Sequence, residues 1–200
     1  EGKVFVQEYS QGKPFKPVEV VGEAEDTGTT VTFHPDPEIF QVTTVYKYDT
    51  LAARLRELAY LNKGIRLTLT DRRNLVNDVD ENGNELETTH FRNDVFYSKD
   101  GLKEFVEYLD GGAERLIESP IYLETDKIIP IEIALQYNTS YTEKIYSYVN
   151  NINTIEGGTH LQGFKMGLTR TLKNYADKAG MLAKLKFDLA ADDFREGLTA

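Results

Sequence analysis

Residues 148–160 read YVNNINTIEGGTH, and a helical pattern starts at their end. The stretch joins a strand signal at Tyr148-Val149 to a helix start at Thr159 through a turn that carries the amides of Asn150 and Asn151. Asn side chains at a strand end commonly satisfy exposed backbone groups, so these residues predict a turn clamp. The stretch contains neither a nucleophile motif nor a phosphate loop.

A long helix is predicted after this turn, with Thr159 as its cap and Gly180 as its end. Its apolar stripe repeats at helical spacing. The members of the stripe are Leu161, Phe164, Leu168, Leu172, Tyr175 and Ala179.

The middle of the chain alternates helix and strand patterns. A helix is predicted over 49–64, followed by a strand at 65–69, a turn at 80–84 and a return strand near 87–91. The Asp, Glu, Asn and Gly residues of that turn predict a hairpin with an acidic tip.

A further helix is expected between a cap at Ser98 or Asp100 and a stop at Gly111-Gly112. Strands are predicted at 121–123 and 129–137, and residues 146–152 are expected to continue the same sheet.

The N-terminal segment predicts three antiparallel strands. Two of them, around 4–6 and 18–21, flank a turn at 11–14, and a third covers 29–33. The proline-rich seam at 35–37 then separates the end of one sheet from an independent domain. The predicted fold class is therefore α+β.

Composition limits the possible functions. A chain of 200 residues with 40% apolar composition can bury a normal core, and the lack of Cys excludes disulfides, thiol catalysis and cysteine-ligated zinc. A cytoplasmic origin fits this composition. No apolar run approaches the ~20 residues that span a bilayer, so a membrane role is not expected.

Charge is distributed unevenly along the chain. The net charge is −10, and residues 71–126 carry 15 Asp and Glu against 6 Lys and Arg. The last helix is instead locally cationic, through Lys165, Arg170 and Lys173 among others. A polyanion would bind at that end of the chain. However, these cations are spread around the helix, a distribution that is also typical of ordinary solvated residues.

Catalytic and metal motifs are missing from the sequence. The three histidines, His34, His90 and His160, have no second ligand at metal-binding spacing and are interpreted as structural or surface residues. Gly157-Gly158 could hold an anion at a helix N-terminus, but a turn that needs positive φ explains the pair equally well.

Several blocks of the chain resemble the ATPase subunits of type IIA topoisomerases, and among them the gyrase B family. The blocks follow one another in the family's order and cover nearly the whole chain. They are TGTTVTFHPDP at 27–37, YDTLAARLRELAYLNKG at 48–64, EIALQYN at 132–138, VNNI at 149–152, EGGTH at 156–160 and DFREGL at 193–198.

The resemblance implies a fold and a domain division. Residues 1–37 would form the C-terminal strands of a GHKL ATP-binding domain, and 38–200 an α+β transducer domain of the ribosomal-protein-S5-domain-2 type. In the family, Thr29 would lie at the floor of the adenine pocket as a cofactor-binding residue. The chain is expected to be an excised piece that stops before the family's Gln-Thr-Lys loop.

The resemblance also implies cofactors and partners. The full-length protein would use ATP and Mg²⁺, whereas the family's catalytic glutamate and glycine lid lie outside these residues. The fragment is therefore expected to contain no catalytic residue, to bind no cofactor or metal by itself and to be inactive. Implied partners are the gyrase A protein, double-stranded DNA and a second copy of the ATPase region that dimerises on ATP binding, with Lys165, Arg170 and Lys173 as candidate DNA-facing residues.

The function implied is a relay that passes ATP binding and hydrolysis to DNA-gate movement during negative supercoiling. Within that relay, the segment 195–197 is expected to lie near the moving joint. Two alternatives stay open: a fragment of the ATPase subunit of topoisomerase IV, and an acidic protein-interaction module without enzymatic context, whose partner would face residues 71–126.

Overall fold

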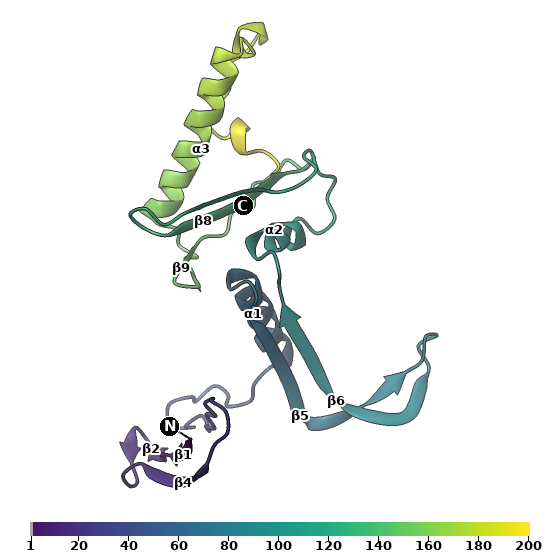
Figure 1. Ribbon diagram of the computed structural model, residues 1–200. Helices are drawn as coiled ribbons and strands as arrows, with labels where there is room; N and C mark the ends of the chain where they lie inside the picture. The colour runs from purple at the N-terminus through teal and green to yellow at the C-terminus, as the bar shows by residue number, and fades with distance from the viewer. Residues whose placement is uncertain (1) are drawn as a thin grey trace. The chain divides into compact units, whose positions relative to one another are not determined.

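The computed structural model describes residues 2–200 (Figure 1). The chain divides into two compact units, and the boundary along the sequence falls between Lys47 and Tyr48. The described residues form three α-helices, two 3-10 turns and several small antiparallel ladders. The α+β fold class predicted from the sequence is confirmed. None of the described helices is long and apolar enough to cross a membrane.

The first unit is built from two hairpin ladders. β1 (Lys3–Val6) pairs with β4 (Glu19–Glu23), and β2 (Tyr9–Ser10) pairs with β3 (Lys13–Pro14) across the predicted turn. This confirms the first two predicted strands. None of residues 2–47 is buried, and Phe15 is 71% exposed, so these residues alone form no core.

The third strand predicted for this unit, at 29–33, does not form. A strand needs a neighbour that completes its hydrogen-bond ladder, and no ladder among residues 2–200 includes this segment. Val31 and Phe33 stay 76% and 66% exposed. High β propensity without a pairing partner leaves the segment without regular secondary structure.

The second unit begins with α1 (Tyr48–Leu61), which packs against a long hairpin of β5 (Arg66–Val79) and β6 (Glu85–Tyr97). Their shared core consists of Tyr48, Ala52, Ala59 and Phe96, with Leu55, Leu67 and Leu69 around it. The predicted helix and hairpin are confirmed, and the hairpin is longer than the sequence suggested. Its acidic tip is closed by Asp80, whose carboxylate accepts hydrogen bonds from the backbone N–H of Asn82 and Asn84.

α2 (Leu102–Asp110) follows the hairpin. The cap predicted at Ser98 or Asp100 is wrong, because Gly101 is the N-cap and has no side-chain cap bond. The buried Ser98 hydroxyl instead accepts the N–H of Gly101 and donates to Glu104, which orders the chain at the helix start. Gly111 ends the helix in the left-handed conformation, as predicted. Phe105 and Val106 bury the inner face of the helix, and α2 packs on the neighbouring sheet.

That sheet has three strands in the order β11-β8-β7. β7 (Ile121–Thr125) and β11 (Leu198–Thr199) flank the central β8 (Ile131–Tyr137), and both run antiparallel to it. Ala134, Leu135 and Leu198 contribute to its core.

Of residues 146–152, which were expected to continue this sheet, only Tyr146 does so, through an N–H bond to Ala200 O beside β11, and the others do not. They form part of a separate hairpin, in which β9 (Tyr148–Val149) pairs with β10 (Ile152–Asn153). Asn150 and Asn151 sit at its tip with φ of 50° and 64°. Two consecutive residues of positive φ make the tight turn that reverses a two-residue hairpin, so the chain turns back instead of extending.

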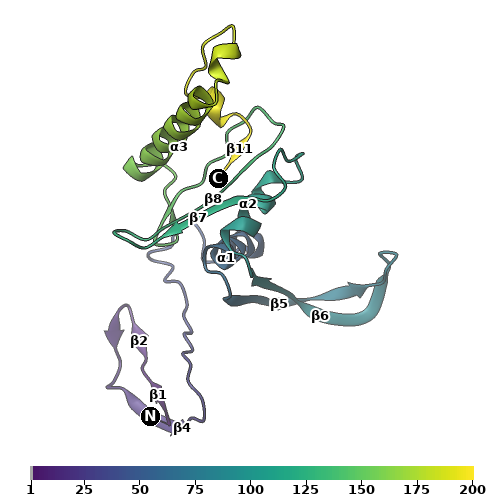
Figure 2. The same ribbon diagram turned by 45° about the horizontal axis from the view of Figure 1, so that its top comes forward.

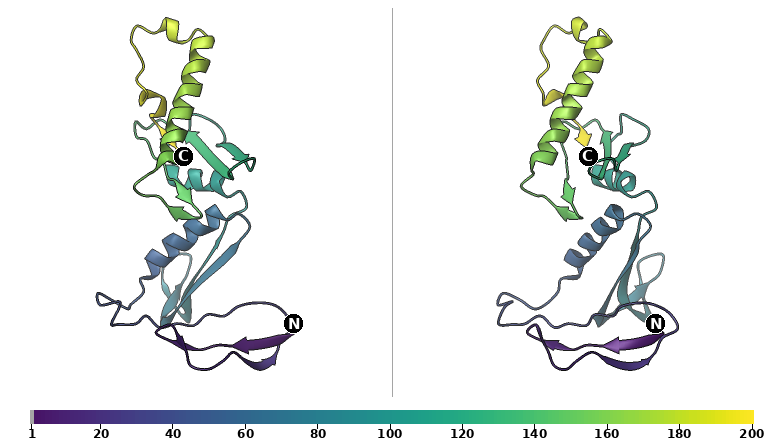
Figure 3. Two further views of the ribbon diagram at one scale, coloured as in Figure 1. Left: turned by 90° about the vertical axis from the view of Figure 1, so that its left-hand side faces the viewer. Right: turned by 60° about the vertical axis from the view of Figure 1, so that its left-hand side comes forward.

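α3 (Thr159–Lys178) is the long C-terminal helix and rises away from the sheet (Figure 3). The 3-10 turns η1 (Leu182–Lys184) and η2 (Asp193–Arg195) belong to the segment that returns along it to β11. The helix is confirmed, but Thr159 is its first residue and not its cap, a position that Gly158 occupies without any side-chain cap bond. No residue of α3 is buried.

Candidate functional site

The candidate site is formed by residues 192–200, which run from η2, packed beside α3, into β11 of the sheet. β11 lies between β8 and residues 144–146: the N–H of Asn138 donates to Gly197 O, and the N–H of Lys144 donates to Leu198 O. Leu198 and Thr199 are completely buried. This short strand is therefore an interior element held from both sides.

Gly197 starts the strand in a conformation that other residues rarely adopt. Its φ is 70°, and an added Cβ would lie 2.8 Å from Ser140 O and closer still to Asn138 O. Both features require glycine, because a side chain would meet backbone that cannot move without displacing β8.

Arg195 connects this strand to α3. Its Nε donates to Glu143 at 2.8 Å, and its Nη1 donates to Thr169 Oγ1 and to Ala191 O, both at 3.0 Å. Asp192 accepts from its remaining nitrogen. With a side chain only 11% exposed, Arg195 ties α3, η2 and the 139–147 loop together.

Glu143 is shared between two cations, Lys165 of α3 and Arg195. Burial by itself would raise the pKa of Glu143, but the hydrogen bonds from Lys165 and Arg195 outweigh burial and hold the pKa below its usual value. In turn, the hydrogen bond to Glu143 raises the pKa of Arg195. Glu143 therefore stays charged at neutral pH. We call Glu143, Lys165 and Arg195 the Arg195 junction.

The opposite end of β11 lies in a buried polar cluster under α2. The Asn138 amide donates to Asp110 at 2.9 Å, and the Thr199 hydroxyl donates to the same Asp110 oxygen. These three side chains are at most 4% exposed. Polar groups so deeply buried fix the register of the strands that carry them.

The Asn150-Asn151 turn contacts α1 directly. Arg54 Nη2 donates to Asn151 O at 2.6 Å, Asn151 Nδ2 donates to Asn62 Oδ1 at 3.0 Å, and the Tyr148 hydroxyl donates to Glu57. Burial, followed by the Glu57 hydrogen bond, raises the pKa of Tyr148. We expected the Asn amides to bond exposed backbone groups, but the Asn151 amide bonds the Asn62 side chain. We call these contacts between the turn and α1 the clamp.

We expect Asn151→Ala to lower the free energy of unfolding by about 1.5 kcal/mol. The change removes one side-chain hydrogen bond and places Ala at positive φ, and each costs on the order of 1 kcal/mol. Urea unfolding of the 200-residue chain measures it. Asn174→Ala, at an exposed position of α3, is the matched control and should change stability by less than about 0.5 kcal/mol. Equal effects of both variants would contradict the clamp.

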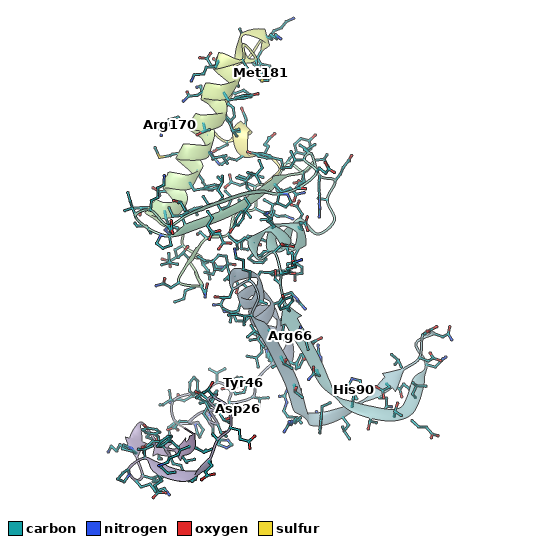
Figure 4. The ribbon with its side chains drawn as sticks, viewed as in Figure 1. Asp26, Tyr46, Arg66, His90, Arg170 and Met181 are labelled. Atoms are coloured by element: carbon teal, nitrogen blue, oxygen red, sulfur yellow. The ribbon has the colours of Figure 1, made fainter. Side chains whose placement is uncertain are left out.

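The residues singled out in the sequence fall in different places. Thr29 is exposed in the first unit, within a segment that has no regular secondary structure. Lys165 belongs to the Arg195 junction, whereas Arg170 and Lys173 are exposed on α3. Figure 4 shows Arg170 on this helix. Glu143 was missed because it is separated from Arg195 by about fifty residues and belongs to no motif.

The histidines lie apart. His90 Nδ1 is 2.6 Å from Asp78 Oδ1, and His160 Nε2 is 3.1 Å from Thr154 Oγ1. Among residues 2–200, no three His, Asp or Glu side chains gather as metal ligands. The ring of His160 also lies close against Gly158 at the start of α3.

Comparisons with known proteins find the same family over the chain. The family model described as DNA gyrase B matches residues 101–200. The DNA gyrase B protein of Eisenibacter elegans is 59% identical and that of Cytophaga aurantiaca 57% identical, in each case over all of this chain. The chain spans 40% of the length of each of these relatives.

Solved structures give the same result. The 43K ATPase domain of Thermus thermophilus gyrase B, crystallised with an aminocoumarin, has a TM-score of 0.78 and 36% identity over all of this chain and 50% of its own. The B-subunit of Myxococcus xanthus DNA gyrase, at 20% identity and a TM-score of 0.72, shares the fold. With the family model matching half of its residues, the chain belongs to the DNA gyrase B family.

Proposed function

We propose that this chain is the part of a gyrase B protein that relays ATP binding and hydrolysis to movement of the DNA gate during negative supercoiling. The observation that supports this most is the Arg195 junction, which ties α3 to the interior strand β11. A buried strand held by directional bonds transmits displacement, because it cannot shift without carrying its neighbours.

We assign the two domains of the chain as the family resemblance implies. Residues 1–37 would complete a GHKL ATP-binding domain, and 38–200 would form the transducer. The exposed apolar side chains of the first unit, such as Phe5 and Phe15, fit a segment that is covered by the rest of that domain.

ATP and Mg²⁺ would be bound mainly outside this chain. Thr29 lies in a segment without a strand partner, so its part in a nucleotide site would depend on the rest of the ATP-binding domain. Thr29 would contribute one hydroxyl to the adenine pocket of the complete protein. The chain by itself is proposed not to hydrolyse ATP.

The proposed partners are the gyrase A protein, double-stranded DNA and a second copy of the ATPase region, in a cytoplasmic enzyme. Of the candidate DNA-facing cations, Arg170 and Lys173 are exposed on α3, whereas Lys165 is paired with Glu143. The gyrase names of the relatives favour this assignment over topoisomerase IV.

Replacing Arg195 in the full-length protein, assembled with gyrase A, tests the relay. Supercoils introduced per ATP hydrolysed should fall at least about fivefold in Arg195→Ala, because coupling free energies between sites are typically 1–3 kcal/mol. ATP binding by the isolated gyrase B protein should stay within about twofold, since Arg195 is not proposed to touch nucleotide.

Two further variants make the test specific. Arg195→Lys keeps the charge but loses the forked geometry, so it should be intermediate. Lys178→Ala, at an exposed position of α3, should behave as the parent enzyme. A folded Arg195→Ala enzyme with unchanged supercoiling per ATP would remove the junction from the relay.

A further inference from the structure

The outer half of the β5–β6 hairpin stands apart from the rest of its unit. Three residues of β5, 72–74, bulge between the paired positions Asp71↔Arg92 and Leu75↔Phe91. Beyond the bulge the two strands curve away from α1 and project alone (Figure 2). We call residues 75–91 the distal arm.

Apolar side chains on both faces of the distal arm are uncovered. Leu75 and Val79 are 57% and 61% exposed on the face that also holds Asn77 and Glu85, which hydrogen-bond to each other. On the opposite face, Leu86 is 45% exposed. A two-stranded hairpin is only marginally stable in water, and a third strand or a packing partner normally stabilises it.

The arm is also strongly acidic. It carries five carboxylates, and there is no Lys or Arg between residues 74 and 91. Hydrogen bonds from Thr88 and then His90 hold the pKa of Asp78 below its usual value, so its charge persists at neutral pH. Glu81 and Glu87 are exposed at the tip and on β6.

The charge and the exposed apolar side chains of the distal arm indicate which kind of partner could bind it. Nucleic acid and anionic lipid would be repelled by the five carboxylates. Both outer edges of the arm's ladder are unpaired among the described residues, and an unpaired edge offers backbone groups to an added strand. Apolar side chains beside carboxylates match a strand that alternates apolar and cationic residues.

We propose that the distal arm is a docking surface for an extended, Lys- and Arg-rich segment of a partner protein, which adds to the hairpin as a third strand. Backbone hydrogen bonds to a free edge would hold the segment, while Glu81 and Glu87 select its charge. The inference concerns a surface remote from the Arg195 junction and does not depend on the relay.

A synthetic peptide tests the surface. The probe is an acetylated peptide of alternating Lys and Val, labelled with a fluorophore, and its counterpart alternates Glu and Val. Fluorescence anisotropy with the 200-residue chain should show salt-sensitive binding of the Lys peptide and none of the Glu peptide. Bound peptide should slow amide hydrogen exchange within residues 75–91.

Matched variants locate the binding. Reversing both exposed charges, Glu81→Lys with Glu87→Lys, should weaken binding about tenfold, as two surface charge contacts would. Glu156→Lys with Asp188→Lys makes the same change in net charge at exposed positions elsewhere and should leave affinity unchanged. Val79→Thr, which keeps a β-branched side chain, should weaken binding by about two- to threefold.

Four results would overturn the proposal. They are no binding of the Lys peptide, equal binding of the Glu peptide, equal weakening by both charge-reversed pairs, and concentration-dependent self-association that the arm variant abolishes. The last result, seen by analytical ultracentrifugation, would make a second copy of this chain the occupant of the arm.

Discussion

Gly197→Ala is expected to lower the free energy of unfolding by about 3–4 kcal/mol, because positive φ and a steric clash add at one position. The added methyl group would press against Asn138 O and Ser140 O, which belong to the backbone segment that follows β8. Relief requires β11 to move out of the sheet. Urea unfolding of the 200-residue chain gives the size of the effect.

Gly112→Ala is the control that measures the cost of positive φ in the absence of a steric clash. Gly112 has a φ of 83°, but nothing lies within 4 Å of an added Cβ. This variant should therefore cost only about 1 kcal/mol, the ordinary penalty of positive φ. Similar losses for Gly112→Ala and Gly197→Ala would show that β11 is not packed as described.

Glu143→Gln should produce the second large effect, a loss of about 2 kcal/mol. The change removes the charge that the partly buried Lys165 shares with the nearly buried Arg195, which keeps only the largely exposed Asp192 as a counter-charge. The control is Glu107→Gln, whose partner Arg115 is 40% exposed, and it should cost less than about 1 kcal/mol. Equal effects of the two changes would contradict the junction's role in stability.

The same variant has a pH signature. Because the folded-state pKa of Glu143 is lowered from 4.5, its contribution is fully present above that value and is lost as pH falls through the folded pKa. Glu143→Gln should therefore differ most from the parent chain near neutral pH, and the difference should shrink in acid. A difference that grows below pH 4.5 would reverse the assigned sign.

Local patterns predicted those elements whose neighbours in sequence are also their neighbours in space. The helix over 49–64, the acidic hairpin tip and the stop at Gly111 follow from spacing, turn residues and backbone freedom. The strand predicted at 29–33 does not form, because a strand needs a neighbouring strand to complete its hydrogen-bond ladder. Residues 148–152 do not continue the sheet, because the chain turns back at two consecutive Asn residues with positive φ.

The candidate site was only partly visible in the sequence. Family resemblance drew attention to 195–197, but β11 has too few residues to show a period, and the buried Thr199 has no apolar signature. Glu143, Lys165 and Arg195 come from separate parts of the chain, so only the folded structure brings them together. Asn138 and Asp110 likewise meet Thr199 through tertiary packing.

Amide hydrogen exchange in the full-length protein, with and without a non-hydrolysable ATP analogue, tests the relay most directly. We expect nucleotide to change the protection of residues 192–200 and of the facing 138–144 segment, while protection of the distal arm at 75–91 stays unchanged. Unchanged protection at both facing segments, in a protein shown to have bound the analogue, would contradict the proposal that the Arg195 junction carries the signal.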